Sequence, residues 1–219
     1  MEDKYIIASR IALELNDGDI VNLGIGTPTL VANFVPKDKH VVFQSENGVI
    51  GLGPVADCDN GLVNAGGICA TINEGGAFID SATTFAIIRG GHVDVTVLGA
   101  LEVDQEGSLA SWIIPGKKVP GMGGAMDLVV GAKKVIIAMT HTNKGASKIL
   151  KKCSLPLTAY KQVNLIVTEM AVMEVKEDGL HLLEVYPSYT IDDVVKATDA
   201  DLIINDVIPM RGVEIWKQC

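Results

Sequence analysis

A glutamate between an apolar run and a glycine-rich turn is the residue of this sequence best placed to do chemistry. Glu46 follows the apolar residues Val41 to Phe43 and precedes Asn47 and Gly48, a dipeptide typical of tight turns. A strand that ends at such a turn fixes its backbone and exposes the side chain in a cleft. A carboxylate there can act as a base, an acid, a metal ligand or a nucleophile. A solvated glutamate beside a hairpin turn would explain the same pattern. The other segments of the chain must therefore distinguish a functional carboxylate from a solvated one.

Two glycines and an asparagine belong to the first strand-like run of the chain. Gly24 and Gly26 have the spacing that begins a dinucleotide fingerprint, but Thr29 occupies the position of its third glycine. Binding of a nicotinamide or flavin cofactor is therefore disfavoured. The functional alternative is that these glycines let a ligand lie against the backbone beside Glu46. Asn22 either aims its carboxamide into that cleft or is an ordinary residue at a strand end.

A second loop, residues 114–128, is rich in glycine and proline. Its last two glycines, Gly123 and Gly124, precede a helix that we expect to begin at Ala125. Such a loop leaves backbone N–H groups free, and these groups can bind an anion or a developing oxyanion. A long structural turn is the alternative, and the two adjacent glycines favour the anion site.

Two further segments carry polar residues that leave alternatives open. Arg89 either binds an anion or pairs locally with Asp80 or Asp94. Residues 140–145 follow another strand-like run, where α/β sheets usually place ligands. Lys144 in that segment either contacts a phosphate or is a solvated loop lysine.

Composition limits the class of protein. The 219 residues are 48% hydrophobic and only 5% aromatic, and Val, Ile, Leu and Ala dominate, as in buried parallel strands covered by helices. The formal net charge of -9 argues against a general nucleic-acid binder, although local basic residues can still form a pocket for an anionic substrate. The mean hydropathy of +0.32 is high for a soluble monomer and predicts a large surface buried against a partner.

Cysteine usage and the N-terminal segment indicate a compartment. Neither the four scattered histidines nor the cysteines have zinc-site spacing, and we interpret the cysteines as unpaired thiols in a reducing cytoplasm: Cys58, Cys69, Cys153 and Cys219. The charged residues 1–5 do not have the pattern of a signal peptide. No run approaches the ~20 apolar residues of a membrane helix.

Strand-like and helix-like segments alternate along the chain. Strands are expected at residues 20–24, 40–45, 93–99, 134–140, 163–168 and 201–204, with a β-hairpin formed by 171–176 and 180–185. Helices are expected at residues 3–15, from Pro28, from an N-cap at Ser81 through Ile88, from Ala125, and over 191–197 behind Thr190. Turn residues leave the stretch 51–76 unassigned. The alternation predicts an α/β fold, an open and mostly parallel sheet with helices on both faces, in a single domain over residues 1–219.

Together these segments resemble the β subunit of a family I, glutamate-dependent CoA transferase. The resemblance covers nearly the whole chain, with particular similarity to the bacterial acetate/butyrate–acetoacetate (3-oxoacid) CoA-transferases. The matching motifs occur in order at residues 21–26, 43–51, 63–66, 88–93, 112–117, 121–127 and 152–158. The resemblance implies the open α/β fold shared by CoA transferases and ribose-phosphate isomerase.

The resemblance also implies a role for each motif residue. Glu46 would be the nucleophile of a ping-pong reaction that passes through a glutamyl-CoA thioester. Gly124 would donate a backbone N–H to the oxyanion, and Asn22 would be the active-site asparagine. The remaining positions would bind CoA or substrate: Gly24, Gly26, Asn47, Gly48 and Gly123. Coenzyme A esters would be substrates, and the reaction would need no bound cofactor and no metal.

The family further implies a partner and a choice of substrates. The active site would be completed by an α subunit, in an α2β2 complex. The expected reaction joins acetoacetyl-CoA or butyryl-CoA with acetate or acetoacetate. Some single-chain relatives that use succinyl-CoA carry a lysine where this chain has Gly67, which makes succinate less secure as a substrate. A non-catalytic acyl-CoA-binding subunit and an acyl-CoA hydrolase of the same fold also stay open, as do the preferred acyl chain and the direction of the pathway.

Overall fold

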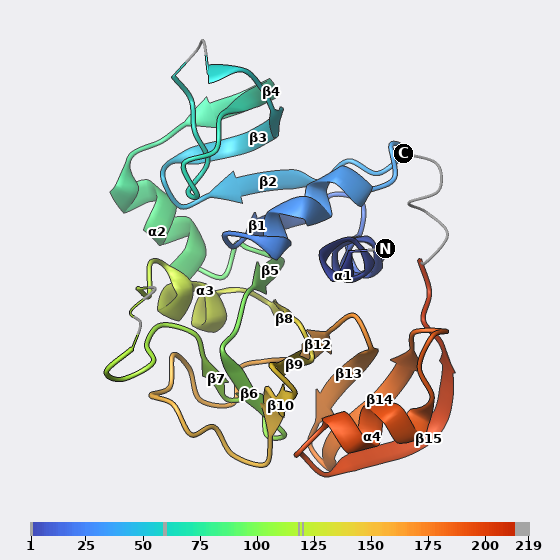
Figure 1. The fold of residues 1–219 in the computed structure, drawn as a ribbon. Coiled ribbons are helices and arrows are strands. Elements are labelled where there is room, and N and C mark those ends of the chain that lie inside the picture. Colours follow the sequence, from blue (N-terminus) through green and yellow to red (C-terminus); the bar gives the residue numbers. More distant parts are fainter. Residues whose placement is uncertain (1, 59–60, 118, 120, 213–219) are drawn as a thin grey trace.

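A ten-stranded sheet organises the chain (Figure 1). The computed structural model describes residues 2–58, 61–117, 119 and 121–212. Within them the ten strands are β1 (Ile20–Leu23), β2 (Val42–Ser45), β3 (Val49–Val55), β4 (Ala70–Phe78), β5 (Val95–Leu98), β8 (Lys134–Ala138), β12 (Leu165–Val167), β13 (Ala171–Lys176), β14 (Gly179–Val185) and β15 (Leu202–Pro209). Their order is β15-β14-β13-β12-β8-β5-β1-β2-β3-β4.

The middle of this sheet is parallel. Strands β12, β8, β5, β1 and β2 run in the same direction, and antiparallel pairs extend the sheet through β3 and β4 on one side and β13 and β14 on the other. The edge strand β15 pairs in parallel with β14. The predicted open, mostly parallel sheet is therefore confirmed, while the single-domain assignment stays a prediction.

Helices cover both faces of the sheet (Figure 1). They are α1 (Asp3–Ala12), the 3-10 helix η1 (Thr27–Phe34), α2 (Ser81–Arg89), α3 (Ala125–Gly131) and α4 (Ile191–Ala197). Short strands form two small additional sheets: β6 (Glu102–Asp104), β7 (Leu109–Ala110) and β11 (Ile149–Leu150), and β9 (Thr142–Asn143) with β10 (Ala146–Ser147). Among the described residues, none of the helices combines the length and the apolar character needed to cross a bilayer.

Alternate residues of the central strands face two separate cores. In β8, Val135 and Ile137 pack with α2 and α3, whereas Ile136 and Ala138 pack with α1 and η1. The remaining positions of these strands follow the same alternation, which explains their almost uninterrupted apolar sequences. The central parallel strands are therefore buried on both faces.

Several local predictions need correction. The expected helix over residues 3–15 ends at Ala12. The helix expected from Pro28 is a 3-10 helix, and the Thr29 N–H donates to Gly26 O, a bond between residues three apart. The N-cap of α2 is Asp80 rather than Ser81, because the Asp80 carboxylate accepts from the Thr83 N–H at 2.7 Å.

The stretch that the sequence leaves unassigned contains the antiparallel pair β3 and β4. Register shifts interrupt this pairing at two places. Such irregularities break the regular alternation on which strand prediction depends. The hairpin of β13 and β14 has a single register shift and was predicted, and Thr190 forms the capping box of α4 with Asp193.

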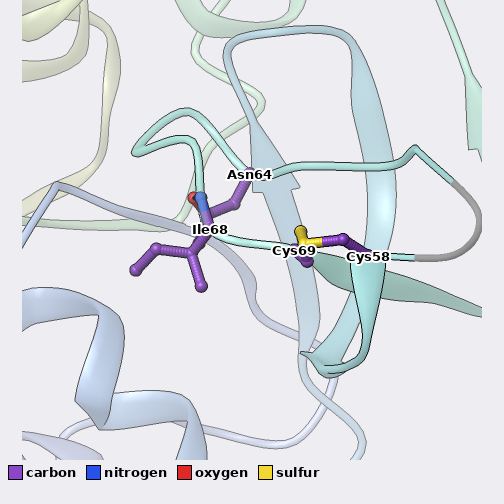
Figure 2. Close-up of a disulfide and its surroundings, with 4 residues drawn as sticks. All are labelled: Cys58, Asn64, Ile68 and Cys69. Carbon is purple, nitrogen blue, oxygen red and sulfur yellow. A yellow bond between two sulfur atoms is a disulfide. The ribbon is translucent and has the colours of Figure 1, made fainter.

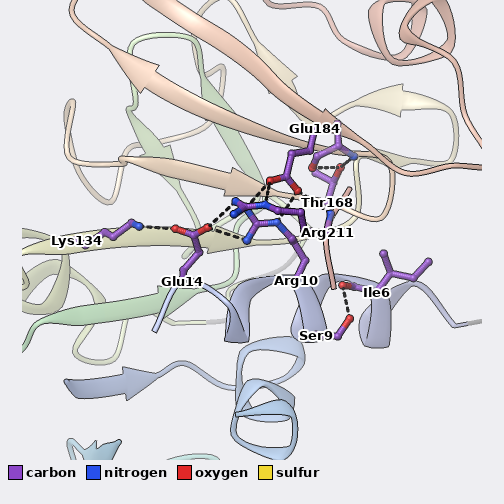
Figure 3. A network of polar contacts seen from close by, with 9 residues as sticks. Ile6, Ser9, Arg10, Glu14, Lys134, Thr168, Glu184 and Arg211 are labelled. Atoms are coloured by element: carbon purple, nitrogen blue, oxygen red, sulfur yellow. Dashed lines mark hydrogen bonds and ion pairs between the residues drawn. The ribbon is translucent and has the colours of Figure 1, made fainter. Parts of the chain in front are cut away.

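A buried ion-pair network ties the N-terminal helix to the opposite part of the sheet (Figure 3). Arg10 is 1% exposed, and its Nε and Nη2 donate to the two carboxylate oxygens of Glu184 on β14 at 2.7 and 2.9 Å. Its Nη1 donates to Glu14 at 2.7 Å. Arg211 donates to Glu184, and Lys134 donates to Glu14. A guanidinium this deep in the protein is tolerated because its charge is matched on two sides.

The network predicts a large loss of stability when one partner is removed. Arg10→Met leaves Glu184 buried without its main counter-charge and should lower the free energy of unfolding by about 3–5 kcal/mol, measured by urea denaturation. Lys161→Met, which removes the exposed pair with Glu106, is the control and should leave the transition almost unchanged. Equal losses of unfolding free energy in the two variants would show that the buried network stabilises the protein no more than an exposed ion pair does.

The same network predicts a pH dependence. Burial alone would raise the pKa of the Glu184 carboxyl, but the bonds and charges of Arg10 and Arg211 outweigh burial and hold it below its ordinary value. Its contribution to stability is therefore present above the unfolded-state pKa and is lost as the pH falls. We expect the unfolding free energy of wild type to fall more steeply below about pH 4.5 than that of Arg10→Met.

Candidate active site

A cleft of about 480 Å³ lies where three neighbouring parallel strands end. Gly24 and Ile25 follow β1, Glu46 follows β2, and Gly99 and Ala100 follow β5, and all five line the cleft. Ligands of open α/β sheets bind at the carboxyl ends of strands, because the chain leaves the sheet there in loops. The geometry thus gathers one acidic side chain and several short backbone segments around a single space.

The carboxylate of Glu46 lies against the glycine-rich loop before α3. The side chain is half-buried, and a methyl group added to Gly124 would overlap its Oε2 and lie 3.1 Å from its Cδ. A methyl group on Gly123, whose φ is +52°, would lie 3.4 Å from Oε1. Glycine is therefore required at position 124 for the carboxylate to lie where it does. Lys118 and Pro120 of the same loop lie outside the described residues.

The backbone of this loop leaves donors available. The Gly124 carbonyl accepts from Leu128 N at 3.0 Å, and Ala125 N donates to Met122 O at 3.1 Å. Within the described part of the chain, the N–H groups of Gly123 and Gly124 donate to no other group. They are free to bind an oxygen atom in the cleft beside Glu46.

Asn22 lies in the wall of the cleft and is 3% exposed. Its Nδ2 donates to the side-chain oxygen of Gln44 at 2.7 Å and to the Gln44 carbonyl at 3.3 Å. This pair crosses from β1 to β2, so Asn22 is fixed by the residue that stands two positions before the glutamate. The predicted placement of Asn22 beside the Glu46 cleft agrees with this position, while its catalytic role stays a prediction.

The other predicted binding positions are divided by the structure. Gly24 and Gly123 line the cleft, whereas Gly26, Asn47 and Gly48 are not part of its described wall. The Asn47 carboxamide donates to Val63 O at 2.7 Å, and a methyl group on Gly48 would overlap the carbonyl of Ile79. These two residues shape the turn that follows Glu46, and their part in substrate binding stays a prediction.

A loop over residues 61–69 supports the segment on both sides of Glu46. The Ala65 N–H donates to Ser45 Oγ at 3.2 Å, and Ala65 also lines the cleft. Asn64 shapes the loop, because its Oδ1 accepts from Gly66 N at 2.9 Å and from Ile68 N at 3.1 Å. Figure 2 shows Asn64 and Ile68 beside each other at the point where the chain returns to the sheet.

A disulfide closes this loop and corrects the prediction of unpaired cysteines. Cys58 and Cys69 are bonded across the β3–β4 hairpin, with their Cα atoms 5.2 Å apart (Figure 2). The pairing follows from the hairpin, which brings residues 11 positions apart to the same place, so sequence spacing gave no sign of it. Cys153 is free, and Cys219 lies outside the described residues. The cysteine-based argument for a reducing cytoplasm therefore loses its basis.

Sequence reasoning missed the apolar part of the cleft and one of its hydroxyl groups. Leu98, Leu101 and Leu128 form an apolar wall, and Ser111 adds a polar side chain. The end of the strand at residues 93–99 was a usable signal for the first of these residues. Ser111 belongs to no recognisable motif and reaches the cleft only through tertiary packing.

Arg89 pairs with neither of the partners expected from the sequence. Its Nε donates to Asp127 on α3 at 2.7 Å, so it links the two helices that cover this face of the sheet. Asp80 is occupied as the N-cap of α2, and Asp94 pairs with Lys133 and accepts from Ile20 N. The pairing with Asp127 gives Arg89 a structural role.

The segment over residues 140–145 does not reach the cleft. His141 is fully buried between the hydroxyl groups of Thr168 and Thr198, at 3.0 and 2.9 Å. Burial, with a smaller effect from the nearby charge of Lys148, lowers the pKa of this ring to about 4, so it is neutral at pH 7. Lys144 is exposed in a turn with φ +51°.

Comparison with known proteins identifies a family and a fold. The family model described as coenzyme A transferase matches residues 4–197. The chain is 54% identical to the acetate CoA-transferase subunit beta of Haemophilus influenzae, over 98% of this chain and 100% of that protein. It is 47% identical to one subunit of a probable succinyl-CoA:3-ketoacid coenzyme A transferase of Bacillus subtilis, over 94% of this chain and 98% of that subunit. The crystal structure of glutaconate coenzyme A-transferase from Acidaminococcus fermentans superposes with a TM-score of 0.77 at 18% identity, over 99% of this chain and 92% of that one.

The disulfide predicts a stability that depends on reduction. Breaking a cross-link between residues separated by 11 positions should lower the unfolding free energy by about 3 kcal/mol, since the unfolded chain gains conformational freedom. Urea denaturation with and without dithiothreitol measures this loss. The Cys58→Ser/Cys69→Ser double variant is the control, because reductant should leave its transition in place. Finding all four cysteines reactive in denatured, unreduced protein would contradict the bond.

Proposed function

Because this chain belongs to the coenzyme A transferase family, we propose that it is a catalytic β subunit that moves coenzyme A between short-chain acids, with Glu46 as the nucleophile. The relatives named above are transferases of the acetate and succinyl-CoA:3-ketoacid type, and this chain is a transferase subunit of that kind. One observation carries the assignment to Glu46: its carboxylate lies beside Gly123 and Gly124 in the cleft, and the N–H groups of these glycines are free among the described residues.

The proposed reaction divides one exchange into covalent steps. The Glu46 carboxylate attacks the thioester carbonyl of the donor acyl-CoA, which forms an acyl-glutamyl anhydride and releases the CoA thiolate. The thiolate attacks the glutamyl carbonyl, so a glutamyl-CoA thioester forms and the first carboxylate leaves. The acceptor carboxylate attacks this thioester and forms a second anhydride with release of thiolate. The thiolate then attacks the acyl carbonyl of that anhydride, which yields the new acyl-CoA and restores Glu46.

The residues of the cleft suit the electronic demand of each step. Every addition places negative charge on a carbonyl oxygen, and a backbone N–H already aimed at that oxygen stabilises the charge without reorganisation. A carboxylate is a weak nucleophile, so the rate must come largely from holding it in place. The close packing of Glu46 against Gly124 supplies that constraint.

The proposed donors are acetoacetyl-CoA and butyryl-CoA, with acetate or acetoacetate as acceptor. The apolar wall of Leu98, Leu101 and Leu128 suits a short hydrocarbon chain. A succinyl-CoA:3-oxoacid transferase subunit is the alternative, supported by the B. subtilis relative. Gly67 presents open space and no cation where some relatives of that type carry lysine, which favours the first proposal.

The proposed partner is a CoA-transferase α subunit, assembled as α2β2. Both relatives are named as one subunit of their enzyme, which supports a partner chain. Ile25, which lines the cleft, and Met126, which follows the cleft residue Ala125 on α3, are 65% and 50% exposed, and apolar side chains around a site suit a covering subunit. The proposal also places the complex in the cytoplasm, where coenzyme A esters are made and used.

A decisive test is to trap the covalent intermediate. The chain, combined with its α partner and acetoacetyl-CoA, should carry a modification on the peptide that contains Glu46 after treatment with borohydride or hydroxylamine. Glu46→Gln should abolish the modification and reduce CoA transfer by several orders of magnitude, because an amide does not replace the carboxylate nucleophile. Glu106→Gln, at an exposed ion pair, should retain both properties.

The outcomes also separate the proposal from two other functions. Near-normal transfer by Glu46→Gln would refute the proposal. Binding of the ester with no exchange of CoA would identify a non-catalytic binding subunit. Release of free CoA with no transfer to acetate would identify a hydrolase.

Gly124→Ala tests the packing of the nucleophile. The added methyl group would displace the carboxylate of Glu46, and a displacement of about 1 Å in a catalytic group can cost roughly a hundredfold in rate. Gly99→Ala adds the same methyl group to the same cleft in open space, so a smaller loss is expected. The turnover number of the reconstituted complex measures both, and a Gly124→Ala enzyme with wild-type turnover would contradict the geometric argument.

A further inference from the structure

Polar side chains are scarce in the cleft beside Glu46. Of the described residues that line it, only Asn22, Glu46 and Ser111 have a polar side chain, and the others are apolar or contribute backbone. Glu46 is the proposed nucleophile, and the Nδ2 of Asn22 is engaged by Gln44. Ser111 is the polar side chain of the cleft that has no role in the proposed reaction.

Ser111 is held in place by one neighbour. Its N–H donates to Thr158 Oγ1 at 3.0 Å, and its Oγ lies 2.8 Å from the same oxygen. Thr158 is only 4% exposed, and its own N–H is bonded to Leu109 O at 2.7 Å. The position of Ser111 is thus set by a residue of the 152–158 segment and not by the cleft itself.

The direction of the hydroxyl hydrogens follows from the available acceptors. Among the described residues, the hydroxyl hydrogen of Thr158 has one acceptor within reach, the Oγ of Ser111. A buried hydroxyl group rarely leaves its hydrogen unbonded. On this argument Thr158 is assigned as the donor and Ser111 as the acceptor. The hydrogen of the Ser111 hydroxyl then has no partner within the described protein and is free to point into the cleft.

A free hydroxyl donor on an otherwise apolar wall suits a substrate that has a hydrogen-bond acceptor on its acyl chain. Leu98, Leu101 and Leu128 line the same cleft and offer no hydrogen bond. An acyl chain with a second oxygen satisfies the donor, whereas a saturated chain leaves it without a partner. Sites that hydrogen-bond a substrate group discriminate strongly against analogues that lack the group, more strongly than apolar pockets discriminate by size.

We propose that Ser111 is a specificity-determining residue, whose hydroxyl donates a hydrogen bond to the 3-oxo group of the acyl chain and so favours 3-oxoacyl over saturated acyl groups. The inference rests on the proposed transferase function and adds to it a residue that reads the substrate. It makes Thr158 a positioning residue, since Thr158 acts through Ser111.

The test compares two donors that have equally long carbon chains and differ at the third carbon. The reconstituted complex is assayed with acetoacetyl-CoA and with butyryl-CoA, each with acetate as acceptor, and the ratio of the two kcat/KM values is the readout. Ser111→Ala should lower the ratio of acetoacetyl-CoA over butyryl-CoA by roughly ten- to a hundredfold. Ser111→Thr, which keeps the hydroxyl, should retain most of the wild-type ratio. Ser154→Ala, at an exposed serine bonded to Glu102, should leave the ratio unchanged.

The possible outcomes distinguish this inference from the function on which it rests. An unchanged ratio in Ser111→Ala, or an equal loss with both esters, would overturn the role of Ser111. A wild-type complex that transfers CoA from neither ester would overturn the proposed function instead. If Ser111→Ala does not fold, Ser111→Cys keeps the side-chain volume with only a weak donor and should lower the ratio in the same direction.

Discussion

The contact between the Glu46 carboxylate and the backbone of Gly124 is the constraint on which the site depends. A side chain at position 124 and a carboxylate at its observed place cannot coexist. The contact requires that β2 end at residue 45 and that the loop before α3 arrive opposite it. The central strands that carry the loops of the cleft have their two faces buried in separate cores. The carboxylate of the proposed nucleophile thus lies against backbone, and the N–H groups of Gly123 and Gly124 are free among the described residues.

The contact between Glu46 and Gly124 can position the carboxylate only if the surrounding backbone is rigid. A carboxylate surrounded by solvent is a poor nucleophile, so its reactivity depends on how little it can move. The Asn22–Gln44 bond and the Ala65–Ser45 bond hold the two residues before Glu46, and the bond from Asn47 to the Val63 carbonyl holds the residue after it. The disulfide closes the loop that makes two of these bonds. On the other side of the sheet, the Arg10 network fixes α1 against β14, so that both faces resist displacement of the strands.

Local patterns predicted most of this arrangement. The apolar runs identified the parallel strands, the glycine loop and Glu46 were found as candidate chemistry, and Thr190 was correctly placed as a helix cap. Features that depend on tertiary contacts escaped prediction. The irregular β3–β4 pairing hid a hairpin, and that hairpin alone brings Cys58 to Cys69. Arg89 found its partner on a helix 38 residues away, at a distance in sequence where spacing carries no information.

Ser111 shows the same limit most clearly, and it bears on how substrates are told apart. The proposed chemistry acts on a carboxyl carbon that every acyl-CoA shares, so Glu46 and the glycine N–H groups provide no discrimination. Choice among acids must come from the groups that contact the rest of the chain. An apolar wall of leucines separates short acids only weakly, because each methylene is worth about 1–3 kcal/mol. Discrimination by oxygen content therefore depends on the few polar side chains of the cleft. Fixed by Thr158 from a distant segment, Ser111 is placed to supply it on this subunit.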